Sequence, residues 1–181
     1  MRLSTSVLLV SLALFSPSIL SSQGPGGGAG TRVLTVSEAT VLTFMREEEK
    51  LARDVYLVMY EEWGTPVFSN IAASEQRHMD ALLGLLVKYG LPDPASADVG
   101  VFTDASLQAL YDQLVAEGRQ SVLAALEVGV LIEEVDIEDL QAAIAGTAKV
   151  DLRRVYSNLL SGSENHLAAF TAHIESLDGN P

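Results

Sequence analysis

Four long stretches of the sequence repeat apolar residues at the three- and four-residue spacing of one helix face. These stretches lie at about residues 37–62, 67–89, 119–144 and 150–177, with a shorter one at 104–117. Turn-forming residues separate them, namely Gly64 and Pro66, then Gly90, and later Gly146. No segment alternates apolar and polar residues over a useful strand length. The sequence therefore predicts an all-α fold.

The lengths of the connections predict how the helices pair. Short connections join the first long stretch to the second and the third to the fourth, which is typical of two antiparallel hairpins. The segment between the hairpins is much longer and contains the short helix predicted at 104–117. We therefore expect a four-helix bundle in which a long crossover joins two hairpins.

The N-terminal residues differ in kind from the rest. Arg2 precedes a short apolar run at residues 7–15, and small residues follow at Ser21 and Ser22. This layout predicts a secretory signal peptide at residues 1–22, and the run is short for a membrane span. The alternative interpretation of residues 1–22 is an anchor helix that is not cleaved. The glycine-rich stretch that follows predicts a flexible tether at 23–35, and the bundle is expected at 36–178.

The predicted signal and the composition limit the possible partners. Cleavage would leave an exported chain, periplasmic or extracellular, with no stable membrane insertion. With 24 acidic and 11 basic residues the net charge is -13, which argues against binding nucleic acid and suits metal cations. The chain has no cysteine, which excludes disulfides, thiolate zinc sites and iron–sulfur clusters. Any bound metal must rest on histidine and carboxylate ligands.

Polar residues interrupt the apolar faces of the first hairpin. Glu49 shares a helix face with Met45 and Tyr56, where an unpaired charge would be costly to bury. Glu75 and His78 are three residues apart, so both side chains point the same way, as in bundles that bind a metal pair. Glu48 is the alternative to Glu49, while Glu47 is expected in solvent and Tyr56 in the core.

The second hairpin offers a histidine and two glutamates. His166 lies on the apolar face with Leu159 and Phe170. Glu127 and Glu134 are seven residues apart, which places both on one face of their helix. Pairing Glu127 with His166 centres on the turn at Gly146, just as pairing Glu49 with Glu75 centres near the first turn. The alternative for His166 is a hydrogen-bonded core histidine.

These motifs resemble those of the ferritin-like superfamily. Glu49, with alanine three residues later and tyrosine seven residues later, is similar to the first-helix motif of ferritins, bacterioferritins and rubrerythrins. The Glu75–His78 pair resembles their second-helix motif. More closely, the stretches 46–56, 74–82, 126–140 and 156–170 look like a bacterial and archaeal ferritin-like family known mainly as a domain of unknown function. The resemblance covers about residues 36–177.

The resemblance implies a ferritin-like bundle with a di-metal site. Position by position, it implies Glu49, Glu75, His78 and His166 as metal ligands, and we choose Glu127 as the ligand from the third long helix, with Glu134 as a further candidate. The superfamily has a glutamate three residues before the last histidine, where this chain has Ser163, so Glu134 or Glu164 would substitute. The ligand set favours two iron ions, with manganese or zinc as alternatives.

Two classes of function fit this prediction. One is a di-iron or di-manganese protein that oxidises Fe(II) or handles O₂ or peroxide; as an enzyme it would be a ferroxidase- or peroxidase-like oxidoreductase. The other is a non-catalytic bundle that binds metal or a partner, and a metal-free bundle with paired Glu and His side chains is a third possibility. No extra C-terminal helix for a ferritin cage is visible, so a monomer or homodimer is expected.

Overall fold

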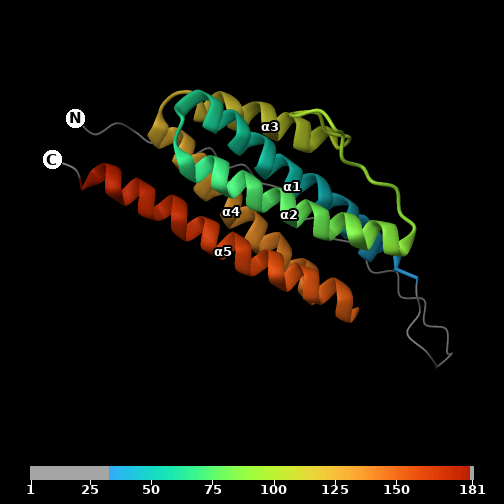
Figure 1. Ribbon diagram of the computed structural model, residues 1–181. Coiled ribbons are helices and arrows are strands. Elements are labelled where there is room, and N and C mark those ends of the chain that lie inside the picture. Colours follow the sequence, from blue (N-terminus) through green and yellow to red (C-terminus); the bar gives the residue numbers. More distant parts are fainter. Residues whose placement is uncertain (1–32, 180–181) are drawn as a thin grey trace. The chain divides into compact units, whose positions relative to one another are not determined.

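The structure, a computed structural model, describes residues 33–179, which form five α-helices and no β-strand (Figure 1). The helices are α1 (Val36–Trp63), α2 (Pro66–Tyr89), α3 (Ala105–Gly118), α4 (Val122–Ala145) and α5 (Val150–Asp178). The all-α prediction is confirmed. The predicted signal peptide and all of the predicted tether except residues 33–35 lie outside the described residues. No helix in the described part is long and apolar enough to cross a membrane.

Local sequence signals explain where the helices begin and end. Thr35 and Glu38 form a capping box at the start of α1, each side chain bonding the other's backbone N–H. Gly64 ends α1 with a left-handed φ of 65°, which glycine adopts without steric cost. Pro66 is then the first residue of α2, where its missing N–H is no loss. Asp104 caps α3 through two backbone N–H groups.

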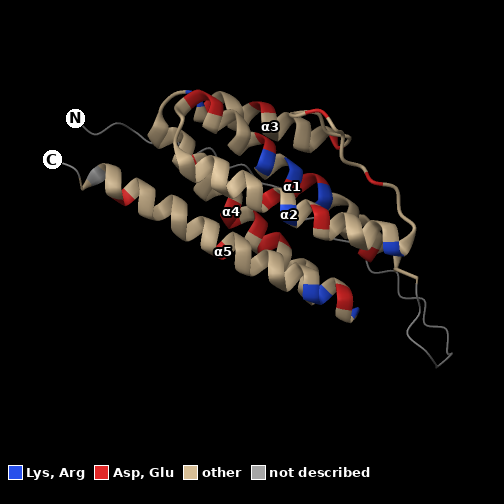
Figure 2. Cartoon of the chain, in the orientation of Figure 1, with Lys and Arg blue, Asp and Glu red and all other residues tan. Residues whose placement is uncertain are grey.

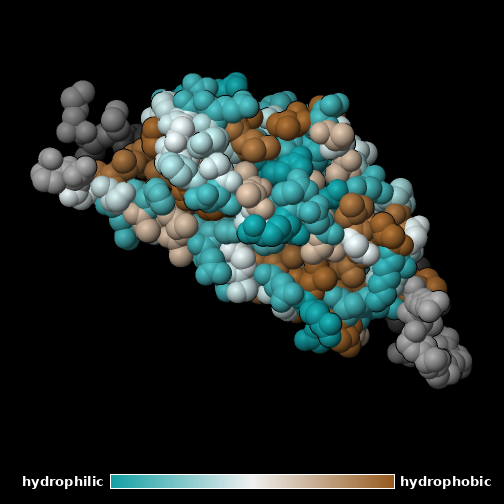
Figure 3. Space-filling model, viewed as in Figure 1, coloured by the Kyte–Doolittle hydropathy of each residue, from teal (hydrophilic) through white to brown (hydrophobic). Residues whose placement is uncertain are grey.

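The long helices pack as two hairpins. Helix α1 packs against α2, and α4 against α5; α1 also contacts α4, and α2 contacts α5 (Figure 1). Helix α3 belongs to the crossover and lies against α1 and α4. Hydrophilic residues cover much of the face seen in Figure 3, with apolar residues between them. The interior is unusual in containing many buried charged residues, among them Glu48, Glu49, Lys50 and Glu75.

The core consists of two apolar clusters. One includes Val55, Tyr56, Phe68 and Phe170, and the other includes Leu42, Leu82, Leu86 and Tyr156. Each long helix contributes to both clusters, and the buried residues between its two contributions are polar, except for Met79 on α2. On α2, for example, Glu75 and His78 lie between Ile71 and Leu82. A polar layer therefore crosses the bundle between the two apolar clusters.

A second face of α1 holds the crossover in place. Glu47 accepts hydrogen bonds from the backbone N–H groups of Thr103 and Asp104, at 2.5 Å and 3.0 Å. Lys50 is completely buried, pairs with Asp54 and donates to the Asp98 carbonyl at 2.9 Å. The expectation that Glu47 is solvated is therefore wrong, because the crossover covers this face of the helix.

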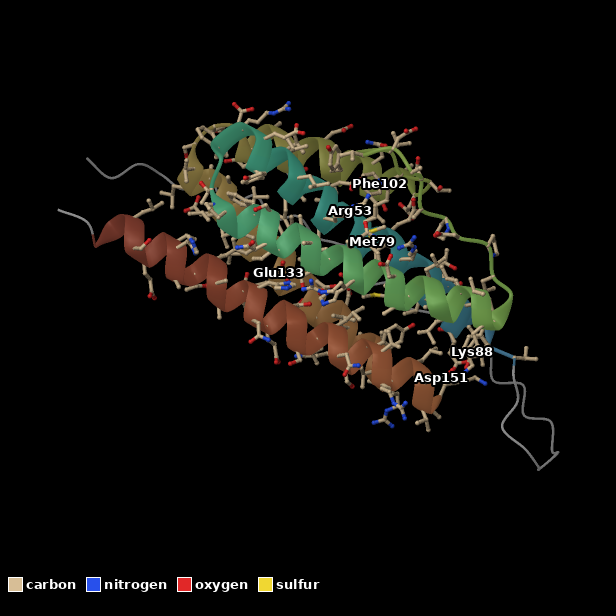
Figure 4. The ribbon with its side chains drawn as sticks, viewed as in Figure 1. Arg53, Met79, Lys88, Phe102, Glu133 and Asp151 are labelled. Carbon is tan, nitrogen blue, oxygen red and sulfur yellow. The ribbon has the colours of Figure 1, made fainter. Side chains whose placement is uncertain are left out.

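We predict that Lys50→Met destabilises the protein strongly. The substitution keeps most of the side-chain volume but removes one of the two basic partners of the buried Asp54 carboxylate. We expect the free energy of unfolding in urea to fall by roughly 3 kcal/mol. Lys88→Met is the control, because the Lys88–Asp151 pair is partly exposed (Figure 4) and should be worth less than about 1 kcal/mol. Equal losses in the two variants would contradict the prediction.

Candidate metal centre

The polar layer gathers acidic and imidazole side chains from four helices. Figure 2 shows acidic residues on α1 and α4 near the middle of these helices. The layer contains Glu48 and Glu49 of α1, Glu75 and His78 of α2, Glu133 and Asp136 of α4, and Ser163 and His166 of α5. All of them are at most 9% exposed. Buried acids in such number need hydrogen bonds, protons or a metal to offset the loss of hydration.

Two groups of ligand atoms share Glu75. In the first, the Nδ1 atom of His78 lies 3.1 Å from Glu49 Oε2 and 2.8 Å from Glu75 Oε2. In the second, the Nδ1 atom of His166 lies 2.7 Å from Glu75 Oε1 and 3.5 Å from Glu133 Oε2 (Glu133 in Figure 4). Each group offers three ligand atoms within 4.8 Å of one another. The imidazole rings stack with centroids 5.4 Å apart.

Several atoms of these groups lack a hydrogen-bond partner. They are Glu49 Oε1, Glu75 Oε1 and His166 Nδ1. The last two are close to each other, but the contact is not aligned as a hydrogen bond. An unsatisfied buried polar atom costs about 1–3 kcal/mol, so native structures contain few of them. Glu75 Oε1 and His166 Nδ1 approach each other without a hydrogen bond, as ligand atoms do around an ion, whereas His78 Nδ1 and Glu49 Oε2 form a hydrogen bond of 3.1 Å. The residues therefore fit a pair of metal ions.

The electrostatics without metal favour bound protons. Burial and the neighbouring acids raise the pKa of Glu49 and of Asp136 well above their usual range. Burial likewise raises the pKa of Glu133 to about 7, against the opposite effect of His166. Glu75 differs, because the imidazoles of His166 and His78 outweigh its burial and lower its pKa. Metal binding would replace protons held by these groups.

The structure brings together four of the six predicted site residues. Glu49, Glu75, His78 and His166 lie in the two groups. Glu127 and Glu134 do not, because both are exposed, and the expectation that they face the interior is wrong. Their neighbours Glu133 and Asp136 occupy the interior instead.

The composition of α4 explains why the buried face of this helix differs from the face predicted for Glu127 and Glu134. Its first half is apolar on nearly every face, so the spacing of apolar residues does not identify the buried stripe. A shift of one residue rotates the assigned face by roughly 100°. The sequence does contain one signal for the buried face, namely a glycine inside the helix, Gly129. In the structure a Cβ there would lie 2.8 Å from the Phe170 ring, so this face packs closely against α5. The same buried face continues along α4 to Glu133 and Asp136.

Ser163 stands where the resemblance predicts a glutamate, and Asp136 provides a carboxylate next to it. The hydroxyl of Ser163 donates to Asp136 Oδ2 and also lies 3.1 Å from the Leu159 carbonyl oxygen. The acid thus comes from α4, across the helix interface from the position where the resemblance predicted a glutamate. Glu164, like Glu134, is exposed and does not substitute.

Tyr56 connects the polar layer to the apolar core. It is fully buried as predicted, and its ring packs 5.1 Å from that of Phe170. Its hydroxyl also donates a hydrogen bond of 2.7 Å to Glu133 Oε1. Hydrogen bonds of this kind fix the orientation of metal-binding side chains. Tyr56 is therefore both a core aromatic and a positioning residue for Glu133.

Known proteins are similar to this chain in sequence and in fold. A family model described as an uncharacterized protein domain (DUF2202) matches residues 38–180. Uncharacterized protein MJ0754 of Methanocaldococcus jannaschii is 47% identical over 148 residues, which covers 81% of this chain and 80% of that protein. A crystal structure of hypothetical protein MJ0754 from Methanococcus jannaschii is 44% identical to this chain, with a TM-score of 0.81. The structural match covers 86% of this chain and 89% of the MJ0754 chain.

We predict that Gly162→Ala disturbs His78. A Cβ at Gly162 would lie 2.5 Å from His78 Nε2, so the imidazole must move. We expect the free energy of unfolding to fall by about 1–3 kcal/mol, as in other overpacked interiors. Gly84→Ala is the matched control, because nothing lies within 4 Å of its Cβ position in α2 and alanine favours helix. Urea denaturation should show Gly84→Ala at or above wild type, and a Gly162→Ala variant that matches it would contradict the prediction.

We also predict that the chelator-treated protein loses stability as pH rises. The folded chain holds protons on Glu49 and Asp136 that the unfolded chain releases above about pH 4.5, so rising pH favours unfolding. His166 acts in the same direction: the adjacent carboxylates outweigh its burial and raise its pKa to about 10, so its contribution is lost as pH rises toward that value. Glu75 opposes this trend only below about pH 4.5. The melting temperature should therefore be lower at about pH 8.5 than at about pH 5.5, and a higher one would contradict this.

Proposed function

The chain belongs to the DUF2202 family of uncharacterized protein domains, and we propose that it is a ferritin-like four-helix bundle that binds two metal ions in its polar layer. The observation that carries the proposal is the pair of three-residue groups that share Glu75, each with one histidine. Two hairpins joined by a long crossover are the arrangement in which bundles hold such sites between facing helices.

The two metal positions would use different residues around one shared carboxylate. Glu49 and His78 would hold one ion, and Glu133 and His166 the other. Glu75 would belong to both positions, because one of its oxygens lies near His78 and the other near His166. Asp136, oriented by Ser163, supplies a fourth carboxylate beside them.

Carboxylate oxygens and imidazole nitrogens without thiolates suit Fe(II) and Mn(II), and also zinc. We propose two iron ions as the native occupants. When bound, they would supply the redox chemistry needed to oxidise Fe(II) or to reduce O₂ or peroxide. The chain itself would hold the ions, exclude water with the apolar clusters and keep Glu133 oriented through Tyr56.

Export and a monomeric or homodimeric state remain part of the proposal on the strength of the sequence alone. The layout of residues 1–22 supports export, and the strongly acidic composition suits a cation-binding protein.

We predict that the protein binds two Fe(II) ions per chain under anaerobic conditions with excess Mg²⁺ present. His78→Ala and His166→Ala should each remove one ion, because each histidine belongs to a different group. Glu127→Gln and Glu134→Gln are the controls and should retain both ions, since their side chains are exposed. Metal analysis after gel filtration gives the stoichiometry.

Less than one ion per wild-type chain, or the same content in all variants, would refute the two-metal proposal. Oxygen uptake on Fe(II) addition then separates the two classes of function. Uptake that His78→Ala abolishes supports an oxidoreductase, and two bound ions without uptake would leave a non-catalytic metal-binding role.

A further inference from the structure

Three acidic residues lie together on the side of the polar layer where α1 meets α4. Glu48 comes from α1, while Asp136 and Asp139 come from α4. Glu48 is 7% exposed and Asp136 5%, whereas Asp139 is only half-buried. Burial and the neighbouring carboxyl groups of Asp136 and Asp139 raise the pKa of Glu48. The three residues thus lead from the surface to the inner layer.

Two buried oxygen atoms of this cluster have no hydrogen-bond partner. They are Glu48 Oε2 and Asp136 Oδ1. The charged groups that act most strongly on Glu48 are Asp136 and Asp139, and those acting on Asp136 are again acidic. No lysine or arginine is among these strongest influences. An unpartnered oxygen on a buried carboxylate surrounded by other carboxylates points to a cation as the missing partner.

The two-metal site does not account for Glu48 and Asp139. Two divalent ions carry four positive charges, and these are balanced by the four carboxylates of Glu49, Glu75, Glu133 and Asp136. Glu48 and Asp139 add negative charge beyond that balance, on the side of Asp136 that faces the surface.

We propose that Glu48 and Asp139, with Asp136 on the inner side, form a third cation position between solvent and the two-metal site. The inference rests on the proposed function, because it places this position next to that site. Only oxygen ligands are available here, so the position takes a hard divalent cation such as Mg²⁺ or Mn²⁺. The cation keeps part of its water shell, since the two tightly gathered groups among the described residues are those with a histidine.

The absence of a histidine makes the third position distinguishable from the other two. Mg²⁺ binds oxygen ligands and has little affinity for imidazole, so excess Mg²⁺ should displace Mn²⁺ from the carboxylate position alone. We would titrate the chelator-treated full chain with Mn²⁺ and follow free Mn²⁺ by electron paramagnetic resonance. Wild type should bind three Mn²⁺ ions without Mg²⁺ and two with it.

Two variants remove the third position and leave the histidine groups intact. Glu48→Gln and Asp139→Asn should each bind two Mn²⁺ ions whether or not Mg²⁺ is present. Glu138→Gln is the matched control, since it makes the same charge change on an exposed neighbour in α4 and should retain three. Both test substitutions relieve repulsion between buried acids, and circular dichroism melting verifies that the variants fold. Asp139→Asn alters a half-buried side chain and supplies the readout should Glu48→Gln not fold.

The outcomes separate this inference from the proposed function. If wild type and both variants bind two ions with and without Mg²⁺, the third position is refuted and the two-metal site stands. If all three proteins bind three ions, the third ion lies elsewhere and the inference fails. If wild type binds no Mn²⁺ at all, the two-metal site and the third position are both refuted.

Discussion

The contact of Glu75 with two histidines is the interaction on which the interior depends. His78 shares a helix with Glu75, but His166 comes from α5 in the other hairpin. Glu75 is 1% exposed, so its charge acts in a medium of low polarity, where electrostatic interactions with neighbouring groups are stronger than in water. Its carboxylate therefore joins the two hairpins electrostatically. The apolar clusters on either side keep water away and so maintain the strength of that link.

The predictable part of the fold follows from strong local signals. Gly64, Pro66 and Gly90 identified the ends of α1 and α2 because each acts through its own backbone geometry. Glu49, Glu75, His78 and His166 were identifiable because each interrupts an apolar stripe. In α4 no such contrast exists, since apolar residues occupy most faces of its first half. Apart from Gly129, the features that identify Glu133 and Asp136 are their contacts with Tyr56 and Ser163, which lie far away in the sequence.

Ser163 shows a second limit of inference from sequence. A comparison by position finds a serine where a glutamate is expected and suggests a weakened site. In space, the serine hydroxyl holds the carboxylate of Asp136 at the same interface. A ligand can therefore pass from one helix to its neighbour while the donor atoms stay in the layer. Such an exchange leaves the chemistry of the layer intact and changes only which helix supplies it.

Helix α1 has to satisfy two sets of polar partners at once. Glu49 belongs to one of the two groups of candidate ligands, while Glu47 and Lys50 bind the crossover. These residues are adjacent, so a helix that shifted by one residue along its axis would break both sets together. The crossover bonds therefore fix the axial position of α1 that keeps Glu49 level with His78. This explains why α1 carries so many charged residues between Arg46 and Asp54. Some of them belong to the polar layer, and others bind the crossover and so fix the position of the helix.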